Sequence, residues 1–186
     1  MPPKSISSLG ELTELMLATV TPRRGLLQSL CSNKPLDPAD IAVLETALQR
    51  LQRAASSAPD YAVTLAATGD ITVHTDLHYE ITELVRDLDF CRRGATAFFA
   101  DFATQTAAES EDLRAALQGK HFCALVSDRD GTVNNYCARY QTSVQSLYNA
   151  VVLERFAQAQ TDAAVILTSA PLQDTGILDI SLNPPQ

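Results

Sequence analysis

The sequence lacks any long hydrophobic run. No apolar stretch approaches the roughly 20 residues that a helix needs to cross a bilayer, and residues 1–5 lack the apolar block of a signal peptide. These two absences predict a cytoplasmic protein that has no membrane partner.

The sequence also lacks the cysteine and charge patterns of several classes of binding protein. The cysteines form no CxxC pair, so we expect reduced thiols rather than a zinc site or a disulfide framework. They are Cys31, Cys91, Cys123 and Cys137. Lys and Arg number 14 against 22 Asp and Glu, which gives a formal net charge of −8. Such a chain repels nucleic acid and anionic lipid, so we expect neither as a partner.

What the chain does have is enough apolar residues for a core. Hydrophobic residues make up 46% of it and charged residues 19%, which is the balance of a globular protein. As far as residue 119, the apolar positions recur mainly at helical spacing. A first helix is expected to end at Pro22. A second begins with Asp37 as its cap and Pro38 at its first position, and a third begins near Thr75 and Asp76.

Two parts of this helical region are less regular. Residues 61–73 alternate weakly and contain Gly69, a pattern that fits either a short strand or a loop. The aromatic residues Phe98, Phe99 and Phe102 indicate another buried helix face. No cofactor motif occurs here, so the roles left open are a homodimer formed through the helices, docking of a partner, and cover for the residues that follow.

The pattern changes at about residue 120. Residues 122–126 and 163–167 are short, continuous apolar runs, as expected of strands buried on both faces of a parallel sheet. Thr142 or Ser143 is predicted to cap a helix between them, so that the order is strand, helix, strand. Function in such sheets gathers at the carboxyl ends of the strands, which is where Asp128 and Thr168 lie.

Asp128 and Asp130, followed by Gly131, suit phosphoryl transfer. One carboxylate can attack phosphorus to form an aspartyl-phosphate, and the other can protonate the leaving oxygen and then activate water. A hard cation such as Mg²⁺ is expected to bridge the carboxylates and the phosphate. Gly131 permits a sharp turn that directs backbone N–H groups at phosphate oxygens.

Residues 128–133, Asp-Arg-Asp-Gly-Thr-Val, resemble the first signature of the haloacid dehalogenase (HAD) superfamily of phosphatases, DxDGT[LVI] after a hydrophobic strand. The resemblance implies that Asp128 is the nucleophile and a metal ligand. It also implies that Asp130 is the acid/base, with its main-chain carbonyl on the metal. Gly131 and Thr132 would contribute to phosphate binding.

The second signature of that superfamily is an apolar strand that ends in Thr or Ser, and residues 165–168 are similar to it. This likeness implies that Thr168 binds phosphate, with Ser169 as the alternative register. The implied fold is α/β. A mainly helical N-terminal domain, residues 1–119, precedes the start of a Rossmann-like parallel-sheet HAD domain, residues 120–186, which is partial.

Within the superfamily, residues 122–171 are most similar to the trehalose-phosphatase branch of sugar phosphatases, some of which carry a helical N-terminal domain. That branch usually has Gly-Arg after the second signature, where this chain has Ser-Ala-Pro. The Asp-Arg-Asp-Gly-Thr motif also occurs in histidinol-phosphate and heptose-bisphosphate phosphatases, which tend to begin at the motif. The resemblance implies a phosphorylated sugar as the small-molecule substrate, with trehalose 6-phosphate as the candidate.

Other interpretations of the motif are a capped turn without catalysis and a calcium loop. A calcium loop needs further oxygen ligands and a closing Glu, which residues 133–137 do not supply. An enzyme of the HAD type, however, needs a Lys or Arg beside the phosphate and a later acidic pair at the metal. Residues 169–186 contain no Lys or Arg, and no buried strand is predicted to lead into their acids, Asp174 and Asp179.

We therefore expect a piece of a longer phosphatase, with little or no turnover by the 186 residues alone. The alternative is a non-catalytic helical interaction module fused to a degenerate HAD-like half domain.

Overall fold

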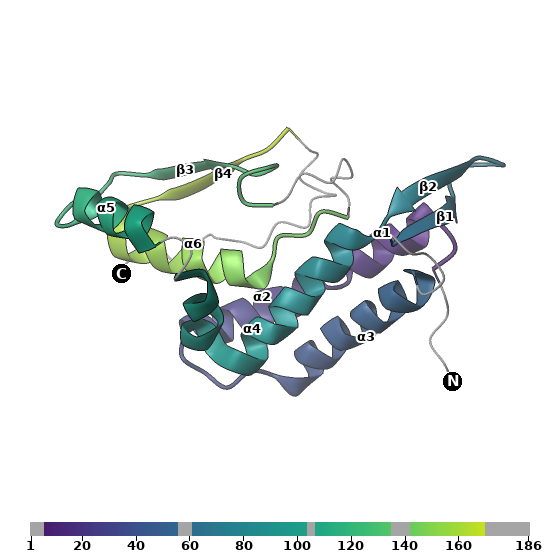
Figure 1. The fold of residues 1–186 in the computed structure, drawn as a ribbon, viewed down its shortest axis with the longest axis horizontal. Helices are drawn as coiled ribbons and strands as arrows, with labels where there is room; N and C mark the ends of the chain where they lie inside the picture. The colour runs from purple at the N-terminus through teal and green to yellow at the C-terminus, as the bar shows by residue number, and fades with distance from the viewer. Residues whose placement is uncertain (1–5, 56–60, 104–106, 135–141, 170–186) are drawn as a thin grey trace.

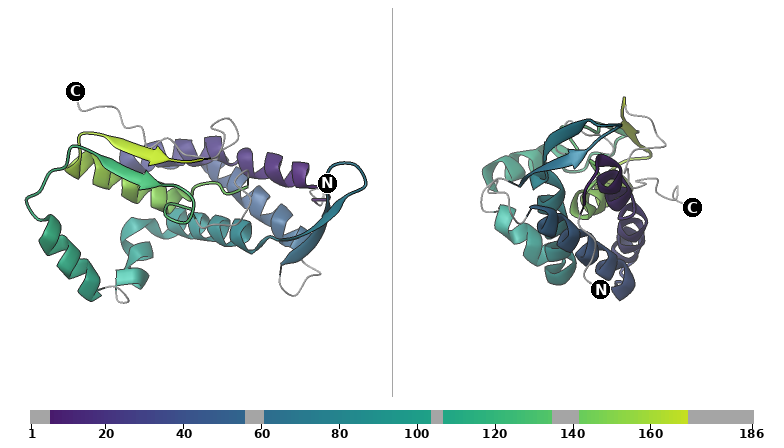
Figure 2. Two further views of the ribbon diagram at one scale, coloured as in Figure 1. Left: turned by 90° about the horizontal axis from the view of Figure 1, so that it is seen from above. Right: turned by 90° about the vertical axis from the view of Figure 1, so that its right-hand side faces the viewer.

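The computed structural model describes residues 6–55, 61–103, 107–134 and 142–169. The elements in these ranges are α1 (Leu9–Leu17), α2 (Val20–Cys31), α3 (Pro38–Ala55), β1 (Ala62–Ala66), β2 (Thr72–Asp76), α4 (His78–Ala103), α5 (Ala107–Leu117), β3 (Leu125–Asp128), α6 (Leu147–Gln160) and β4 (Ala164–Leu167). Helices α1 to α4 form a bundle, with the β1–β2 hairpin at one end (Figure 1). Strands β3 and β4 lie together with α6, beside the bundle (Figure 2). The predicted α/β class with a mainly helical N-terminal region is confirmed.

Local signals explain where the bundle helices begin. Pro38 is the first residue of α3, and Asp37 Oδ1 accepts the Ala39 N–H at 2.8 Å, as predicted. The prediction for Pro22 is wrong, because the chain breaks at Ala18–Thr19 and Pro22 lies in the first turn of α2. Proline is tolerated there because the N–H groups of a first turn have no helical partner.

The weakly alternating segment after α3 is a strand pair rather than a loop. β1 and β2 are antiparallel, in register from Ala62 opposite Asp76 to Ala66 opposite Thr72, and Gly69 has a φ of +67° in the connection. The helix predicted to begin near Thr75 and Asp76 begins at His78, because both of those residues still belong to β2. Asp76 Oδ1 accepts the His78 N–H at 2.7 Å, so this carboxylate still serves the first turn of α4.

Helix α4 is interrupted at Gly94, where φ is 74° and ψ is 163°. A side chain would strain this backbone, and glycine allows the last turns to change direction. They bring Phe98 against Phe90, with ring centroids 5.2 Å apart, and Phe99 within 5.7 Å of Phe90. Of the predicted aromatic stripe, Phe98 is buried and Phe102 is 44% exposed.

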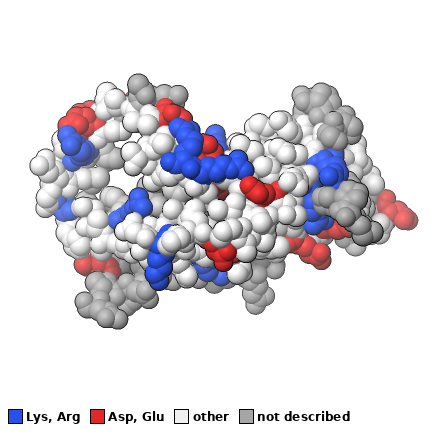
Figure 3. All heavy atoms as spheres, turned by 90° about the horizontal axis from the view of Figure 1, so that it is seen from below, with Lys and Arg blue, Asp and Glu red and all other residues white. Residues whose placement is uncertain are grey.

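One hydrophobic core joins the bundle to α6. Its buried members include Leu12, Leu26, Leu44 and Leu84 from the four bundle helices and Leu147 from α6. The outer face of the bundle carries basic and acidic side chains next to one another (Figure 3). Exposed pairs of this kind, such as Arg92 with Glu45 at 2.8 Å, each contribute about 1 kcal/mol or less.

A buried ion pair lies where α2, α4 and α6 meet. Arg23 Nε donates to Asp87 Oδ2 at 2.6 Å, and both side chains have no exposed surface. Arg23 also donates to the Thr19 hydroxyl, and Asp87 Oδ1 accepts the Leu147 N–H at 2.7 Å. The pair therefore ties two bundle helices to the first residue of α6.

Burial raises the pKa of Asp87 from 3.8 to about 6, although Arg23 and the Leu147 N–H favour the ionised form. A folded-state pKa above the unfolded value means that the folded chain holds this proton more tightly. The stability it contributes is complete below about pH 4 and is lost as the pH rises through about 6. To isolate this effect, the unfolding free energy of the wild type is compared with that of Asp87→Asn, which cannot titrate. We expect the wild-type value minus the variant value to fall by on the order of 3 kcal/mol between about pH 4 and pH 7. Urea denaturation measures this difference, and a rise over the same range would show that Arg23 outweighs burial.

Strands β3 and β4 are parallel and joined through α6, which confirms the strand, helix, strand order. Their burial alternates, with Val126, Val165 and Leu167 45% to 58% exposed. The prediction of strands buried on both faces is therefore wrong for the described residues. In that part of the chain, α6 covers one face of the sheet (Figure 1). The apolar run does not itself specify a second covering layer.

The start of α6 also differs from the prediction. Thr142 and Ser143 precede the helix, whose N-cap is Ser146, and the side chain of Ser146 makes no capping bond. The Asp87 carboxylate of α4 caps the helix instead, because it accepts the N–H of Leu147, the first residue of α6. A cap supplied from 60 residues away in the sequence leaves no local pattern.

Three of the cysteines lie in the described ranges, and all three are free thiols: Cys31, Cys91 and Cys123. Cys137, Asp174 and Asp179 lie outside those ranges. None of the helices in the described part of the chain is long and apolar enough to span a bilayer.

Candidate active site

The two predicted site segments meet at one edge of the sheet. Asp128 is the last residue of β3 and lies opposite Leu167, the last residue of β4. The Arg129 N–H continues the ladder by donating to the Leu167 carbonyl at 3.0 Å. Because the strands are parallel, Asp128 and Thr168 emerge at the same carboxyl edge, as the strand order predicted. Ser169 follows as an exposed residue.

The motif after Asp128 is a tight turn built on one carbonyl. The Arg129 carbonyl accepts the N–H groups of Val133 and Asn134, each at 3.0 Å, and that of Thr132 at 3.4 Å. Gly131 has a φ of +89°, and its N–H donates to the Asn134 carbonyl at 2.7 Å. This conformation favours glycine, in agreement with the sharp turn predicted at this position. The prediction that the turn directs its N–H groups at phosphate oxygens is wrong for Gly131 and Thr132, because both N–H groups donate to carbonyls within the turn.

Arg129, between the two motif aspartates, is a site residue that the sequence prediction missed. Its side chain is 1% exposed, and its Nη1 donates to Asp130 Oδ1 at 2.5 Å. Its Nη2 donates to the Ser143 carbonyl, which also accepts the side-chain amide of Asn134 at 2.8 Å. The available signal was a basic residue between two acids, a position where exposure to solvent is the usual outcome.

The turn is also attached to the helix beneath the sheet. Asn149 of α6 donates its side-chain amide to the Val133 carbonyl at 2.9 Å, and Val133 is 4% exposed. The motif loop thus has one attachment to α6 and another, through Arg129 and Asn134, to Ser143. Both leave Asp128, Gly131 and Thr132 exposed at the sheet edge.

The oxygen donors at this edge are of the kind that Mg²⁺ prefers. The Asp128 side chain is exposed, and that of Asp130 is 26% exposed with one oxygen held by Arg129. The described residues contain no group of three or more His, Cys, Asp or Glu side chains placed to hold a metal ion. Asp128 and Asp130 thus offer carboxylate oxygens of the type that Mg²⁺ binds, and the described residues complete no ligand set around them.

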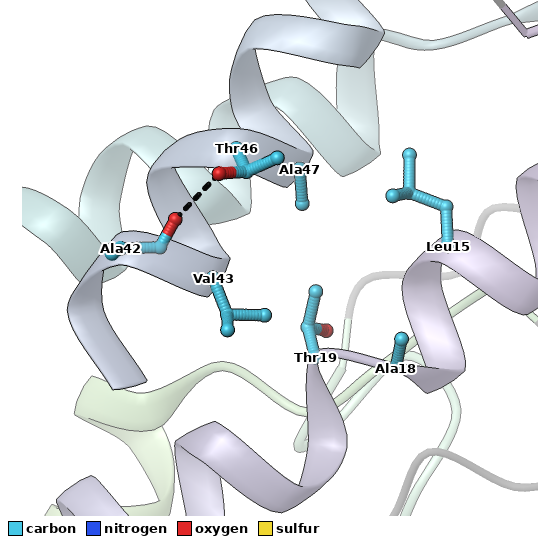
Figure 4. A pocket seen from close by; sticks show the side chains of 7 residues that line it. All are labelled: Leu15, Ala18, Thr19, Ala42, Val43, Thr46 and Ala47. Atoms are coloured by element: carbon cyan, nitrogen blue, oxygen red, sulfur yellow. Dashed lines mark hydrogen bonds between the residues drawn. The ribbon is translucent and has the colours of Figure 1, made fainter. Parts of the chain in front are cut away.

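An open depression of about 250 Å³ lies elsewhere, between the α1–α2 break and α3 (Figure 4). Its lining carries no charged side chain and consists of Leu15, Ala18, Thr19, Ala42, Val43, Thr46 and Ala47. A phosphate needs cations or N–H donors, so this depression does not suit the chemistry of the motif.

Comparison with known proteins identifies both parts of the chain. The family model described as the trehalose-6-phosphate phosphatase N-terminal helical bundle domain matches residues 8–108. The model described as trehalose-6-phosphate phosphatase, C-terminal, matches residues 125–186. The chain belongs to the trehalose-6-phosphate phosphatase family. The trehalose-phosphatase branch predicted from the motif is thereby confirmed, whereas the domain boundary at residues 119 and 120 stays a prediction.

The curated proteins similar to this chain include proteins named as synthases and proteins named as phosphatases. Alpha,alpha-trehalose-phosphate synthase (UDP-forming) 1 of Caenorhabditis elegans is 28% identical over 204 residues, which cover 96% of this chain and 15% of that protein. Trehalose-phosphatases of Brugia malayi and Caenorhabditis elegans are 42% and 41% identical over 60 residues. These residues cover 32% of this chain and 12% and 14% of the two phosphatases. The chain thus spans only a small part of the length of the relatives it matches.

Proposed function

We propose that this chain supplies the nucleophile half of a Mg²⁺-dependent phosphatase that hydrolyses trehalose 6-phosphate. The observation that carries the proposal is the position of the motif. Asp128 ends β3 and Asp130 lies in the tight turn that follows, at the carboxyl edge of a parallel sheet and next to Thr168, in a chain of the trehalose-6-phosphate phosphatase family. Both family models name a phosphatase, which favours that activity over the synthase named for some longer relatives.

Each predicted site residue then has a role in two displacements. The Asp128 carboxylate attacks phosphorus, the bond from phosphorus to the sugar oxygen breaks, and the Asp130 carboxyl gives its proton to that oxygen. Asp130 then takes a proton from water, the water oxygen attacks phosphorus, and the bond from phosphorus to the Asp128 oxygen breaks, so that inorganic phosphate leaves and the Asp128 carboxylate is restored. Asp128 and the Asp130 main-chain carbonyl would hold Mg²⁺, which supplies positive charge next to the phosphate.

The phosphate oxygens need donors during both steps. We assign this binding to the exposed turn at Gly131 and Thr132 and to the hydroxyl of Thr168 or Ser169. The donor of the turn is the Thr132 hydroxyl, because the N–H groups of Gly131 and Thr132 bond within the turn. HAD phosphatases use further acids at the metal, and in the described residues no third acidic side chain joins Asp128 and Asp130. We therefore expect little or no turnover by the 186 residues alone.

The proposal is tested on the longest natural protein that contains these residues. Phosphate release is measured from trehalose 6-phosphate and from glucose 6-phosphate, with Mg²⁺ and with EDTA. We expect release from trehalose 6-phosphate at least about 100-fold above glucose 6-phosphate, because a disaccharide site gains contacts that a monosaccharide cannot make. We also expect EDTA to abolish release and Mg²⁺ to restore it.

Two results would contradict the proposal. Equal phosphate release with and without EDTA would show that the reaction needs no Mg²⁺, and no release from any sugar phosphate would favour the alternative function. That alternative is a non-catalytic helical interaction module fused to a degenerate HAD-like half domain.

A further inference from the structure

One face of α4 is acidic and buried. Glu80, Glu83 and Asp87 are spaced three and four residues apart, so they lie on the same side of the helix. Their exposures are 0%, 4% and 0%, although carboxylates are rarely so buried without partners. Their neighbours are the elements that follow the motif loop.

The partners of this acidic face come mainly from residues 142–148. The Thr142 hydroxyl donates to Glu80 Oε1 at 2.7 Å, and the Tyr148 hydroxyl donates to Glu83 Oε2 at 2.9 Å. The Leu147 N–H donates to Asp87 at 2.7 Å, as described above. Each acid of the row thus accepts a hydrogen bond from a different residue of the segment.

Tyr79 adds two contacts at the same end of α4. Its hydroxyl donates to the Val144 carbonyl at 3.2 Å and accepts the Ser143 hydroxyl at 3.4 Å. Figure 1 shows the segment before α6 running past the first half of α4. Hydrogen bonds from consecutive residues determine one register, because a shift along α4 would leave buried carboxylates without donors.

The same segment holds the motif loop from its other side. The Ser143 carbonyl accepts from the guanidinium of Arg129 and from the amide of Asn134, and Arg129 holds Asp130 Oδ1. A continuous set of contacts therefore runs from α4, through residues 142 and 143, to the second motif aspartate. It joins the range matched by the N-terminal family model to the range matched by the C-terminal one.

We propose that the acidic face of α4 positions the motif loop, with Glu80, Thr142 and Arg129 as positioning residues for Asp130. The helical bundle is then part of the catalytic apparatus and sets the geometry of the acid/base. The catalytic consequence rests on the proposed function, whereas the mechanical link between α4 and the loop does not.

The mechanical link is tested in the 186-residue chain by amide hydrogen exchange. Thr142→Val removes the hydroxyl that donates to Glu80. The N–H groups of Val133 and Asn134 donate to the Arg129 carbonyl, and we expect them to exchange at least about tenfold faster in this variant. The exchange rates of N–H groups in the middle of α3 should change less than about threefold. Thr142→Ser keeps the hydroxyl and is expected to restore slow exchange.

The matched control is Thr46→Val, which makes the same chemical change in the bundle. Thr46 donates its hydroxyl to the Ala42 carbonyl at 2.8 Å within α3, and it lines the depression between α3 and the α1–α2 break (Figure 4). It should leave the exchange of the loop unchanged. An equal increase at every amide of Thr142→Val, or none at the loop, would overturn the proposal.

The catalytic consequence is measured in the longest natural protein that contains the chain. We expect Thr142→Val to lower kcat for trehalose 6-phosphate by at least about tenfold, with KM within about threefold, and Thr142→Ser to restore it. An unchanged kcat together with a loosened loop would overturn the positioning role. A wild type without turnover would contradict the proposed function and leave the exchange result to decide the link.

Discussion

Asp128→Asn is expected to lower phosphate release from trehalose 6-phosphate by at least about 10³-fold in the longest natural protein that contains this chain. The amide is a poor nucleophile, so the covalent step is lost, and a factor of 10³ corresponds to about 4 kcal/mol of transition-state stabilisation. The side chain is exposed at the end of β3, and the two residues differ little in size. We expect the melting temperature to stay within a few degrees, which circular dichroism checks alongside the kinetics.

The matched control for this change is Asp162→Asn, just before β4 at the opposite edge of the same sheet. Asp162 is 68% exposed and pairs with His121 at 2.8 Å, far along the strands from the motif. It should retain turnover close to that of the wild type. Turnover of Asp128→Asn within about tenfold of the wild type would exclude Asp128 as the nucleophile.

Phe90→Ala is expected to destabilise the chain by about 3–5 kcal/mol, because it removes a large side chain from the core and leaves a cavity. Phe90 has no exposed surface, and its ring packs edge-on against both Phe98 and Phe99. A loss of this size is a large part of the 5–15 kcal/mol by which a domain is usually stable. Urea denaturation followed by circular dichroism measures it.

Phe102→Ala deletes the same side chain from the rim of the same aromatic cluster. Phe102 is 44% exposed and lies 5.6 Å from Phe98, so we expect a loss of about 1 kcal/mol or less. A loss for Phe90→Ala as small as that for Phe102→Ala would mean that the turns after Gly94 are not packed against the rest of α4.

Helix starts were predictable where the signal lies next to the helix. Asp37 and Pro38 act on the N–H groups and the φ angle of their own first turn, so the start of α3 needs no knowledge of the rest of the chain. The start of α6 could not be found in this way, because Asp87 supplies its capping carboxylate from α4. The Pro22 error has a related cause, since a proline is compatible with a first turn and incompatible only with a helix interior.

The strand, helix, strand order of the sheet was predictable from the sequence, whereas the burial of its two faces was not. Apolar runs at residues 122–126 and 163–167 led to the parallel pair β3 and β4, with strand bounds that differ by a few residues. Burial on both faces depends on which elements cover the sheet, and the run itself does not contain that information. The exposed side chains of Val126 and Leu167 follow from that limit.

The candidate site shows the same division. Asp128 and Thr168 were placed at one edge by strand topology alone, and the structure brings those strand ends together. The buried position of Arg129 depends on Ser143, which in turn depends on contacts with α4. Contacts between residues more than 60 positions apart leave no period or spacing in a single sequence.

The interface between α4 and residues 142–148 has a consequence for how this family varies. An acid of α4 and the donor opposite it form a matched pair, so a change in one partner alone leaves a buried polar group without its partner. Chimeras that combine the bundle of one relative with the motif segment of another should therefore fold well only when both sides of this interface are exchanged together. Positions 80 and 142 are therefore expected to covary among relatives, with a substitution at one accompanied by a substitution at the other.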